Sequence, residues 1–492
     1  GTARGATKKG LAPMRLEEFL VAEGVIRPVD LARAVERSEA RGGRITDNLL
    51  ALKLVTPEQI QTALHTMPSH LPASVDATGI ARSILHGLLL KALYRGSVDN
   101  LPGLSQTLKL PSHVIGTLIE EAIEQKLLKV TGATARITLP VLTYTLTTAG
   151  RLAAIEAMEK SSYIGPAPVS LAAYTERAKS QKLAHARDEA ARLRDSLGDL
   201  VLPEEIVEAV GPAIKAGRSI LFYGPPGNGK SSIARRIGRV FADVIHVPYC
   251  IEVEGQIIKI FDPKVHQEVS AATDKPNLTP VKLRHENFDH RWVPCRRPVV
   301  ITGGEFSLDM LELRHVTEAN YYEAPLHIKA IGGTFVIDDF GRQIVQPKDL
   351  LNRWMIPLEE HVDYLKLHTG ATFPVPFDVL VLFCTNLSPS DLMDAAFLRR
   401  IPYKIRLGAP SIEQFGAILK REAAERGLEV ADPVFNWLLS ELRERRQFPL
   451  ACYQPRFIVD HVIEACAYRK VVPALSEGLI GRALDHLYPQ HI

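Results

Sequence analysis

Nine consecutive residues carry the groups that hold a polyphosphate. They are Gly224, Pro225, Pro226, Gly227, Asn228, Gly229, Lys230, Ser231 and Ser232. Glycines let successive backbone N–H groups turn inward on phosphate at the N-terminus of a helix. The ammonium group of Lys230 can reach the outer phosphates, and the hydroxyl of Ser231 can ligate Mg²⁺. The pattern therefore predicts a P-loop that binds a nucleotide polyphosphate together with Mg²⁺.

Two carboxylates and one amide can complete the chemistry of such a site. Asp338 and Asp339 follow one apolar run, and Asn386 follows another. Carboxylate oxygen is a preferred ligand of Mg²⁺, which favours Asp338 as a metal ligand. Asp339 can polarise an attacking water, and the amide of Asn386 can hold that water beside the γ-phosphate. A purely structural pair of aspartates at a strand end is the alternative.

Three arginines are candidates for contact with phosphate. Arg399 and Arg400 follow a predicted short helix, and Arg456 begins a helix in the all-helical segment 411–487. A guanidinium group stabilises the charge of the transition state in phosphoryl transfer. Surface ion pairs are the alternative for these arginines, because such pairs are common and individually weak.

Apolar runs predict the elements that position these groups. Ile220–Tyr223, Phe335–Ile337 and Val379–Cys384 predict buried strands, and Ser232–Phe241 predicts the helix after the P-loop. Strand, glycine-rich loop and helix follow one another without a gap, which is the context that the motif requires. The P-loop and the two carboxylates are about 110 residues apart, a separation compatible with one α/β domain.

The order of these motifs resembles that of the AAA+ ATPases. The resemblance implies ATP and Mg²⁺ as cofactors, Asn386 as sensor 1 and Arg456 as sensor 2. It also implies that Arg400, with Arg399 as second choice, is the arginine finger offered to a neighbouring subunit. A finger that acts on a neighbour requires a homo-oligomeric ring, which in this family is usually a hexamer.

Two details bear on this resemblance. Residues 349–376 resemble the helix and β-hairpin before sensor 1 in MoxR-like AAA+ proteins. Most AAA+ proteins carry Glu where this chain has Asp339, which is one methylene shorter, so either water fills the gap or hydrolysis is slow. No aromatic–apolar–glycine pore loop stands out, which weakens a prediction of peptide threading.

An internal repeat occupies residues 15–67. Its copies begin at Arg15-Leu16 and at Arg44, 29 positions apart, and each predicts two short helices. The repeat resembles the MshEN-type N-terminal domain of type II secretion and type IV pilus ATPases, in which two copies bind cyclic di-GMP. On that resemblance Arg15, Leu16 and Arg44 are possible cyclic di-GMP contacts, since a guanidinium pairs with guanine or phosphate. Departures from the family pattern are Glu17, Ser38, Thr46, Lys53 and Met67. A helical docking module without a ligand is the alternative.

Residues 78–160 predict a winged helix. Helices are expected at about 79–94, 101–108 and 111–128, followed by the β-rich residues 130–146 and a further helix. A DNA reader would present a basic face in the major groove. The third helix instead carries Glu120, Glu121 and Glu124. A protein-interaction module is therefore favoured over a DNA-binding one.

The segments 161–200 and 244–327 are less informative. Proline and glycine mark 161–170 as a linker, and alternating charges mark 171–200 as a solvated connector helix. A strand is expected at 244–249 and a hairpin at 251–261, turned at Glu254-Gly255. Residues 266–327 remain unassigned, as an insertion facing the ring pore or a partner. The group His285, His290 and Cys295 lacks a fourth ligand and zinc-site spacing, which disfavours a metal site.

Composition limits the class of protein. The chain has 492 residues, a net charge of +3 and 46% apolar residues, which predict two to four packed domains and no bulk attraction to nucleic acid. Its five cysteines are odd in number and lack paired spacing, and no apolar run reaches the ~20 residues of a membrane helix. These features predict a cytoplasmic protein with reduced thiols.

The predicted fold is an α/β P-loop AAA+ core with an all-helical C-terminal lid, preceded by a helical repeat domain and a winged-helix-like module. The predicted units are a disordered tail (1–13), the MshEN-like domain (14–70), the winged-helix-like domain (78–160), the linker and connector helix (161–200), the α/β domain (201–410) and the lid (411–492).

Three functional hypotheses follow from these predictions. The first is a ring-forming ATPase that uses ATP hydrolysis to remodel or move a protein partner. The second is an ATP-gated transcription regulator that binds DNA through the winged-helix module. A cyclic di-GMP receptor is compatible with the first.

Overall fold

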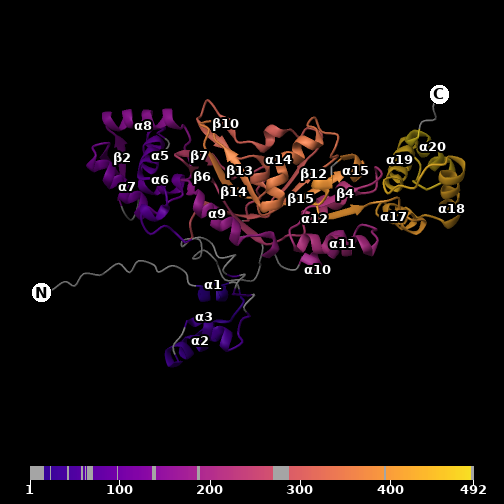
Figure 1. Cartoon of the computed structure of the whole chain (residues 1–492), viewed down its shortest axis with the longest axis horizontal. Coiled ribbons are helices and arrows are strands. Elements are labelled where there is room, and N and C mark those ends of the chain that lie inside the picture. Colours follow the sequence, from indigo (N-terminus) through magenta and orange to yellow (C-terminus); the bar gives the residue numbers. More distant parts are fainter. Residues whose placement is uncertain are drawn as a thin grey trace.

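A computed structural model describes most of the chain (Figure 1). The described residues are 16–22, 24–41, 44–56, 59–60, 63, 70–96, 98–135, 140–185, 189–269, 288–392 and 395–488. The predicted tail 1–13, Arg15, Met67 and His285 lie outside these ranges. Within them, no helix combines the length and the apolar character needed to cross a membrane.

Five parallel strands form the central sheet. In spatial order they are β16 (Tyr403–Arg406), β4 (Ile220–Tyr223), β15 (Leu380–Thr385), β12 (Thr334–Ile337) and β9 (Val299–Thr302). The predicted strands are confirmed to within one residue at each end. Every residue of β12 and β15 is buried, as expected for parallel strands covered on both faces. Because all five strands run in one direction, their carboxyl ends meet at one edge, where α/β sheets bind ligands.

Helices cover both faces of this sheet. On one face, α11 (Glu204–Lys215) and α12 (Lys230–Ile237) pack with α10 (Glu189–Leu197). On the other face lies α14 (Pro347–Glu360), whose fully buried Trp354 contacts the rings of Phe335 and Phe383.

The helix after the P-loop ends four residues before the predicted boundary. It stops at Gly238, and a Cβ at that position would lie 2.8 Å from the side chain of Val299. Glycine has a low helix propensity, and here the neighbouring strand excludes any larger residue. The prediction of helix as far as Phe241 was therefore wrong, because the helix ends at its glycine.

A second group of sheets is formed mostly by residues between α12 and β12, with one strand contributed by residues 169–170. Its five-stranded sheet has the order β10 (Arg314–Val316), β11 (Tyr321–Glu323), β7 (Gln256–Lys259), β6 (Cys250–Val253) and β3 (Val169–Ser170). The β6–β7 hairpin turns at Glu254 and Gly255, with φ of 48° and 78°, and this confirms the predicted turn. The strand β5 (Val244–Pro248) pairs with β8 (Trp292–Arg296), with Cys295 buried in β8.

The remaining short elements between residues 308 and 398 surround these sheets. They are η5 (Leu308–Leu311), α13 (Leu326–Lys329), the hairpin β13 (Val362–Lys366) with β14 (Thr372–Pro376), α15 (Pro389–Leu392) and α16 (Ala395–Leu398). The helix and hairpin expected within 349–376 are confirmed as elements.

The segment 161–200 is not a linker followed by one solvated helix. Its Val169–Ser170 forms β3, which pairs in parallel with β6. It then divides into α9 (Leu171–Ser180), η2 (Leu183–His185) and α10. Tyr174 and Ala178 of α9 are buried in the apolar core that also contains Phe335 and Trp354. Glu176 and Lys179 lie on the exposed face of α9 as predicted, but Arg177 is half-buried against the ring of Trp292. Two apolar inward positions four residues apart complete its packing.

The module before this segment packs against the inserted sheet. It contains η1 (Asp76–Thr78), α5 (Arg82–Tyr94), α6 (Leu101–Leu108), α7 (Ser112–Glu124), β1 (Leu128–Ala135), β2 (Pro140–Leu146) and α8 (Thr148–Lys160). Its apolar core continues into Cys250 and Ile257 of the inserted hairpin. The buried side chain of Arg291 donates to the carbonyl oxygens of Thr78 and Pro168, which ties the module to the insertion.

Helices alone form the two ends of the described chain. The N-terminal end contains α1 (Leu16–Ala22), α2 (Pro28–Arg41) and α3 (Ile45–Ala51), which bury Leu20 and Leu49 against one another. The C-terminal end contains α17 (Ile412–Ala424), α18 (Asp432–Ser440), the π-helical turn η6 (Glu441–Arg445), α19 (Gln454–Arg469) and α20 (Glu477–Leu487). Figure 1 shows α5–α8 and α17–α20 at opposite ends of the molecule, with the sheets between them.

Candidate functional site

The loop after β4 requires glycine at three positions. Gly224, Gly227 and Gly229 have φ of 136°, 79° and 82°, which residues with a Cβ rarely adopt. A Cβ at Gly224 would lie 2.3 Å from the carbonyl oxygen of Leu407, and one at Gly227 would lie 2.2 Å from the ring of Tyr453. The loop is therefore confined between the end of β16 and the beginning of α19.

Lys230 lies inside this loop. Its side chain is buried, and its Nζ donates to the carbonyl oxygens of Gly224 at 2.9 Å and Pro225 at 2.7 Å. Burial lowers the pKa of Lys230 below its ordinary value. The loop carbonyls thus hold an ammonium group at the place where a polyphosphate would need it.

Ser231 and Asp338 meet across the carboxyl edge of the sheet. The hydroxyl of Ser231 donates to Oδ1 of Asp338 at 2.6 Å, and the same oxygen accepts the N–H of Asp339 at 3.1 Å. A hydroxyl and a carboxylate are hard oxygen donors, the type that Mg²⁺ prefers. The two residues that the sequence predicted as metal ligands therefore lie together and fit that ion.

Asp339 and Asn386 form the next contact along this edge. Nδ2 of Asn386 donates to Oδ1 of Asp339 at 3.4 Å. Asp339 has φ of 51°, a left-handed conformation that Asp tolerates better than most residues. The following N–H of Phe340 donates to the carbonyl of Cys384 at 2.7 Å, and Thr385 Oγ1 donates back to the carbonyl of Phe340 at 2.7 Å. The end of β15 thus fixes the position of both polar side chains.

A cavity of about 970 Å³ opens in front of these groups. The predicted site residues that line it are Pro226, Gly227, Asn228, Gly229, Lys230, Ser231, Ser232, Asp338, Asp339, Asn386 and Arg456. Arg456 reaches the cavity from α19, with its side chain 70% exposed and its Nε 3.5 Å from Asp460. Gly224 and Pro225 contribute behind the cavity, through their bonds to Lys230.

The other two predicted arginines do not line this cavity. Arg400 forms an ion pair with Glu359, with its Nη2 at 2.7 Å and its Nε at 2.8 Å from the carboxylate. Its side chain is only 12% exposed, whereas Arg399 is exposed. Within one chain, both arginines therefore lie outside the P-loop cavity.

Several residues of the cavity were not predicted from the sequence. They are the apolar Leu200, Val201, Leu202, Ile233, Ile418 and Phe457, the basic Arg236, Arg342, Arg421 and Arg426, the acidic Asp199, Glu422, Glu425 and Asp460, and Cys384, Cys452 and Tyr453. Most of them come from loop ends and from the C-terminal helices, where no local pattern indicates a ligand. Arg342 had one available signal, because it follows Asp339 by three residues on the same loop.

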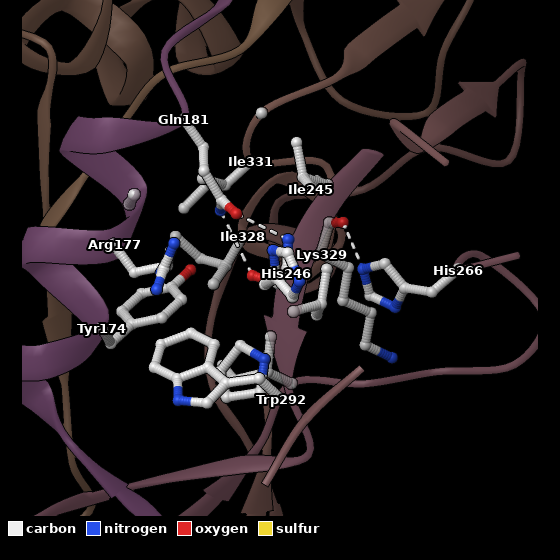
Figure 2. Close-up of a pocket in the computed structure, with 15 residues that line it drawn as sticks. Tyr174, Arg177, Gln181, Ile245, His246, His266, Trp292, Ile328, Lys329 and Ile331 are labelled. Atoms are coloured by element: carbon white, nitrogen blue, oxygen red, sulfur yellow. Dashed lines mark hydrogen bonds between the residues drawn. The ribbon is translucent and has the colours of Figure 1, made fainter. Parts of the chain in front are cut away.

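A second, much smaller cavity of about 20 Å³ lies between α9 and β5 (Figure 2). The side-chain amide of Gln181 accepts the N–H of His246 at 2.6 Å and donates to its carbonyl at 3.2 Å. Burial lowers the pKa of His246 to about 3 and that of His266 to about 4. The two histidines are therefore neutral near pH 7. The space holds about one water, so it is a small gap in the packing between α9 and β5.

The predicted cyclic di-GMP contacts are only partly described. Arg44 is exposed at the beginning of α3, and Leu16 is half-buried at the beginning of α1. Arg15 lies outside the described residues, so a site formed by all three stays a prediction. In the part of the chain that the structure describes, no group of three His, Cys, Asp or Glu side chains is placed to hold a metal ion.

Comparison with known proteins adds little to this geometry. A family model described as a domain of unknown function (DUF8689) matches residues 411–486, which contain α17–α20. No curated protein matches the chain.

Solved structures show only weak likeness. NtrX from Brucella abortus has a TM-score of 0.35 at 12% identity, over 56% of this chain and 52% of that one. The Holliday junction branch migration motor RuvB of Thermotoga maritima has a TM-score of 0.31 at 14% identity, over 58% of this chain and 67% of that one. A RuvB variant reaches 0.35 at 14% identity, over 60% and 73%. Scores of this size do not establish a common fold, so the nature of the site is inferred from its own geometry.

Proposed function

We propose that the chain is a Mg²⁺-dependent ATPase of the AAA+ type. The observation that carries the proposal is the hydrogen bond of 2.6 Å between Ser231 and Asp338, beside the buried Lys230. A P-loop hydroxyl that meets a carboxylate at the carboxyl edge of a parallel sheet is the arrangement that holds Mg²⁺ and nucleotide phosphates.

The P-loop residues divide the binding of ATP between them. Backbone N–H groups of Gly227, Asn228 and Gly229 bind the phosphates, and Lys230 exchanges its bonds to loop carbonyls for bonds to phosphate. Ser231 and Asp338 would hold Mg²⁺, which neutralises the charge that develops on the phosphates. The apolar residues on the other side of the cavity, Leu200, Leu202 and Ile418, would contact the base.

Asp339 and Asn386 would act on the attacking water. The carboxylate of Asp339 accepts a proton from the water, and the amide of Asn386 orients it. Their separation of 3.4 Å leaves both groups facing one small region of the cavity. Arg456 lines the same cavity from α19 and would contact the γ-phosphate as the C-terminal helices close.

Catalysis would be completed by a neighbouring subunit in a ring. Arg399 and Arg400 lie away from the cavity of their own chain. An arginine finger contributes about 10³-fold or more to phosphoryl transfer. Arg400 would have to leave Glu359 before it could act, whereas Arg399 is already exposed. In a hexameric ring, an arginine of one subunit would reach the P-loop cavity of the next. ATP hydrolysis would then act on a protein partner through the two N-terminal modules, residues 14–70 and 78–160.

The module of residues 78–160 suits protein contact better than DNA contact. On α7, Glu121 pairs with Arg82 and His86, and Glu120 and Glu124 are exposed. Exposed carboxylates repel phosphate, so a transcription regulator stays the weaker alternative. The proposal also includes cyclic di-GMP, bound by Arg15, Leu16 and Arg44, as a regulator of the ATPase, but ATP hydrolysis does not depend on it.

Steady-state ATP turnover tests the central proposal. Lys230→Ala should lose nucleotide binding, and Asp339→Asn should bind ATP without hydrolysing it. Lys348→Ala, at an exposed position on α14, serves as the matched control and should behave as wild type. Wild-type turnover in Asp339→Asn would remove that carboxylate from the mechanism.

Two further measurements address the partner. Proteins retained by the Asp339→Asn chain with ATP, and released without it, would identify the remodelled partner. A salt-dependent shift of duplex DNA by the full chain would instead favour the transcription regulator.

A further inference from the structure

The P-loop is in direct contact with the beginning of α19. The N–H of Tyr453 donates to the carbonyl oxygen of Gly227 at 3.1 Å. The N–H of Cys452 donates to Oδ1 of Asn228 at 3.3 Å, and the side chain of Asn228 is buried. Two backbone donors at the start of one helix thus hold the tip of the phosphate loop.

This contact orients a group that phosphate would use. A trans peptide is planar, so its carbonyl and the following N–H point in opposite directions. The bond from Tyr453 to the carbonyl of Gly227 therefore turns the N–H of Asn228 away from α19. Asn228 lines the cavity, and P-loop N–H groups are the ligands of phosphate. The beginning of α19 consequently helps to prepare the loop for its ligand.

The ring of Tyr453 adds a steric contact to these bonds. A Cβ at Gly227 would lie 2.2 Å from the ring, so the loop tip and the ring are packed without free space. A shift of the loop tip must therefore move Tyr453, and a shift of Tyr453 must move the loop.

The position of Tyr453 depends in turn on the end of α20. Its Oη lies 3.0 Å from Oη of Tyr488, which also accepts a bond of 2.7 Å from Nε2 of Gln454. Gln454 is fully buried, and the ring of Tyr488 stacks on Phe448 at 3.8 Å. A continuous set of contacts therefore joins the P-loop tip to the last described helix.

We propose that Tyr453 is a positioning residue that links nucleotide on the P-loop to the position of α20. The proposal rests on the proposed binding of ATP. Phosphate would draw Lys230 from the carbonyls of Gly224 and Pro225, and the loop tip would adjust. The ring of Tyr453 follows that adjustment and carries it to Tyr488. Linkage is reciprocal, so loss of this contact also weakens nucleotide binding.

Nucleotide affinity provides the first test. Binding of mant-ATP with Mg²⁺ is measured for wild type, Tyr453→Ala, Tyr453→Phe and the control Tyr468→Ala. Tyr468 lies on the same helix, is 90% exposed and is outside these contacts. Tyr453→Ala should raise the dissociation constant by about fivefold or more, and raise KM for ATP more than it lowers kcat. Tyr453→Phe keeps the ring and should recover most of the affinity, whereas Tyr468→Ala should match wild type.

Hydrogen exchange provides a readout that a merely structural role would not change. At saturating Mg²⁺ and ATP, wild type and Tyr468→Ala should show altered exchange in α20 as well as in the P-loop. Tyr453→Ala should keep the change in the P-loop and lose the change in α20. If Tyr453→Ala no longer melts cooperatively, Tyr488→Phe takes its place, because it removes the hydroxyl that joins Tyr453 and Gln454 to α20.

The outcomes separate the two proposals. Absence of mant-ATP binding by wild type would overturn the proposed ATPase, and this link with it. Normal binding by wild type, together with wild-type affinity in Tyr453→Ala and the same ATP-dependent change in α20 exchange as in wild type, would overturn the link alone.

Discussion

A buried ion network beneath α14 should contribute measurably to stability. Asp363 accepts hydrogen bonds from Nε2 of His327 at 2.6 Å and from Nη1 of Arg353 at 2.6 Å, and its side chain is only 1% exposed. Burial alone would raise the pKa of Asp363, but the bonds from His327 and Arg353 lower it from 3.8 to about 2. Burial keeps His327 neutral, because it lowers the pKa of that imidazole. The network therefore favours the ionised carboxylate in the folded state.

The lowered pKa gives the size of the effect. A change from 3.8 to about 2 corresponds to roughly 2–3 kcal/mol of stabilisation, at about 1.4 kcal/mol per tenfold change in proton affinity. Because the folded-state pKa is the lower one, this stabilisation is complete above about pH 4. It is lost as the pH falls through about 2.

The perturbation is Asp363→Asn, and the measurement is hydrogen exchange of α14 amides. Opening of α14 separates Arg353 from Asp363, so the variant should exchange roughly 30- to 150-fold faster after correction for intrinsic rates. The ratio should be the same at pH 8 and pH 7, above the ordinary pKa of His327. Asp309→Asn, at an exposed position on the neighbouring η5, should stay within about 0.5 kcal/mol of wild type.

Either of two results would refute this reasoning. One is a ratio below about threefold at pH 7, which would mean that the carboxylate contributes little. The other is a ratio that changes between pH 8 and pH 7, since the pKa of Asp363 lies far below that window and burial holds the pKa of His327 below its ordinary 6.5. The network also matters for the site, because α14 carries Glu359, the partner of Arg400.

Three further predictions concern the site. Gly224→Ala should abolish nucleotide binding and cost about 1–3 kcal/mol in thermal unfolding, because φ is 136° and the Cβ would meet a carbonyl at 2.3 Å; Gly304→Ala, with open space around it, should be neutral. Ser231→Ala should raise the Mg²⁺ concentration for half-maximal ATP turnover by about tenfold, and unchanged dependence on Mg²⁺ would remove this hydroxyl from the metal site. Of Arg399→Ala and Arg400→Ala, the variant that lacks the finger should lose about a thousandfold in turnover while binding ATP normally, and near-normal turnover in both would argue against a finger at this position.

Local sequence patterns were sufficient for the elements that carry the site. The P-loop and β4 are contiguous, so glycine spacing and an apolar run identify them without knowledge of the rest of the chain. The strands before Asp338 and Asn386 are short, apolar and buried on both faces, and the structure confirms them. The β6–β7 turn was predictable because Glu254-Gly255 supplies the positive φ that a two-residue hairpin needs.

Local patterns failed where packing between distant segments decides the outcome. Val169–Ser170 is a strand only because β6 lies beside it, and α9 is buried by two side chains among many charged ones. The helix after the P-loop ends at Ile237, and Val299 leaves no room for a side chain at Gly238. In each case the deciding atom belongs to a residue far away in the chain, which periodicity over a short window does not register.

The sequence by itself determined which residue types could hold phosphate, Mg²⁺ and water in this protein. Only the tertiary structure decided that Ser231 meets Asp338, that Asp339 meets Asn386, and that Arg400 pairs with Glu359 away from the cavity. It also revealed the contact of Tyr453 with the P-loop, which no motif indicated. The physical reason is that a motif depends on neighbouring residues, whereas these contacts depend on strand order and on the packing of helices, and they join residues between 41 and 226 positions apart in the chain.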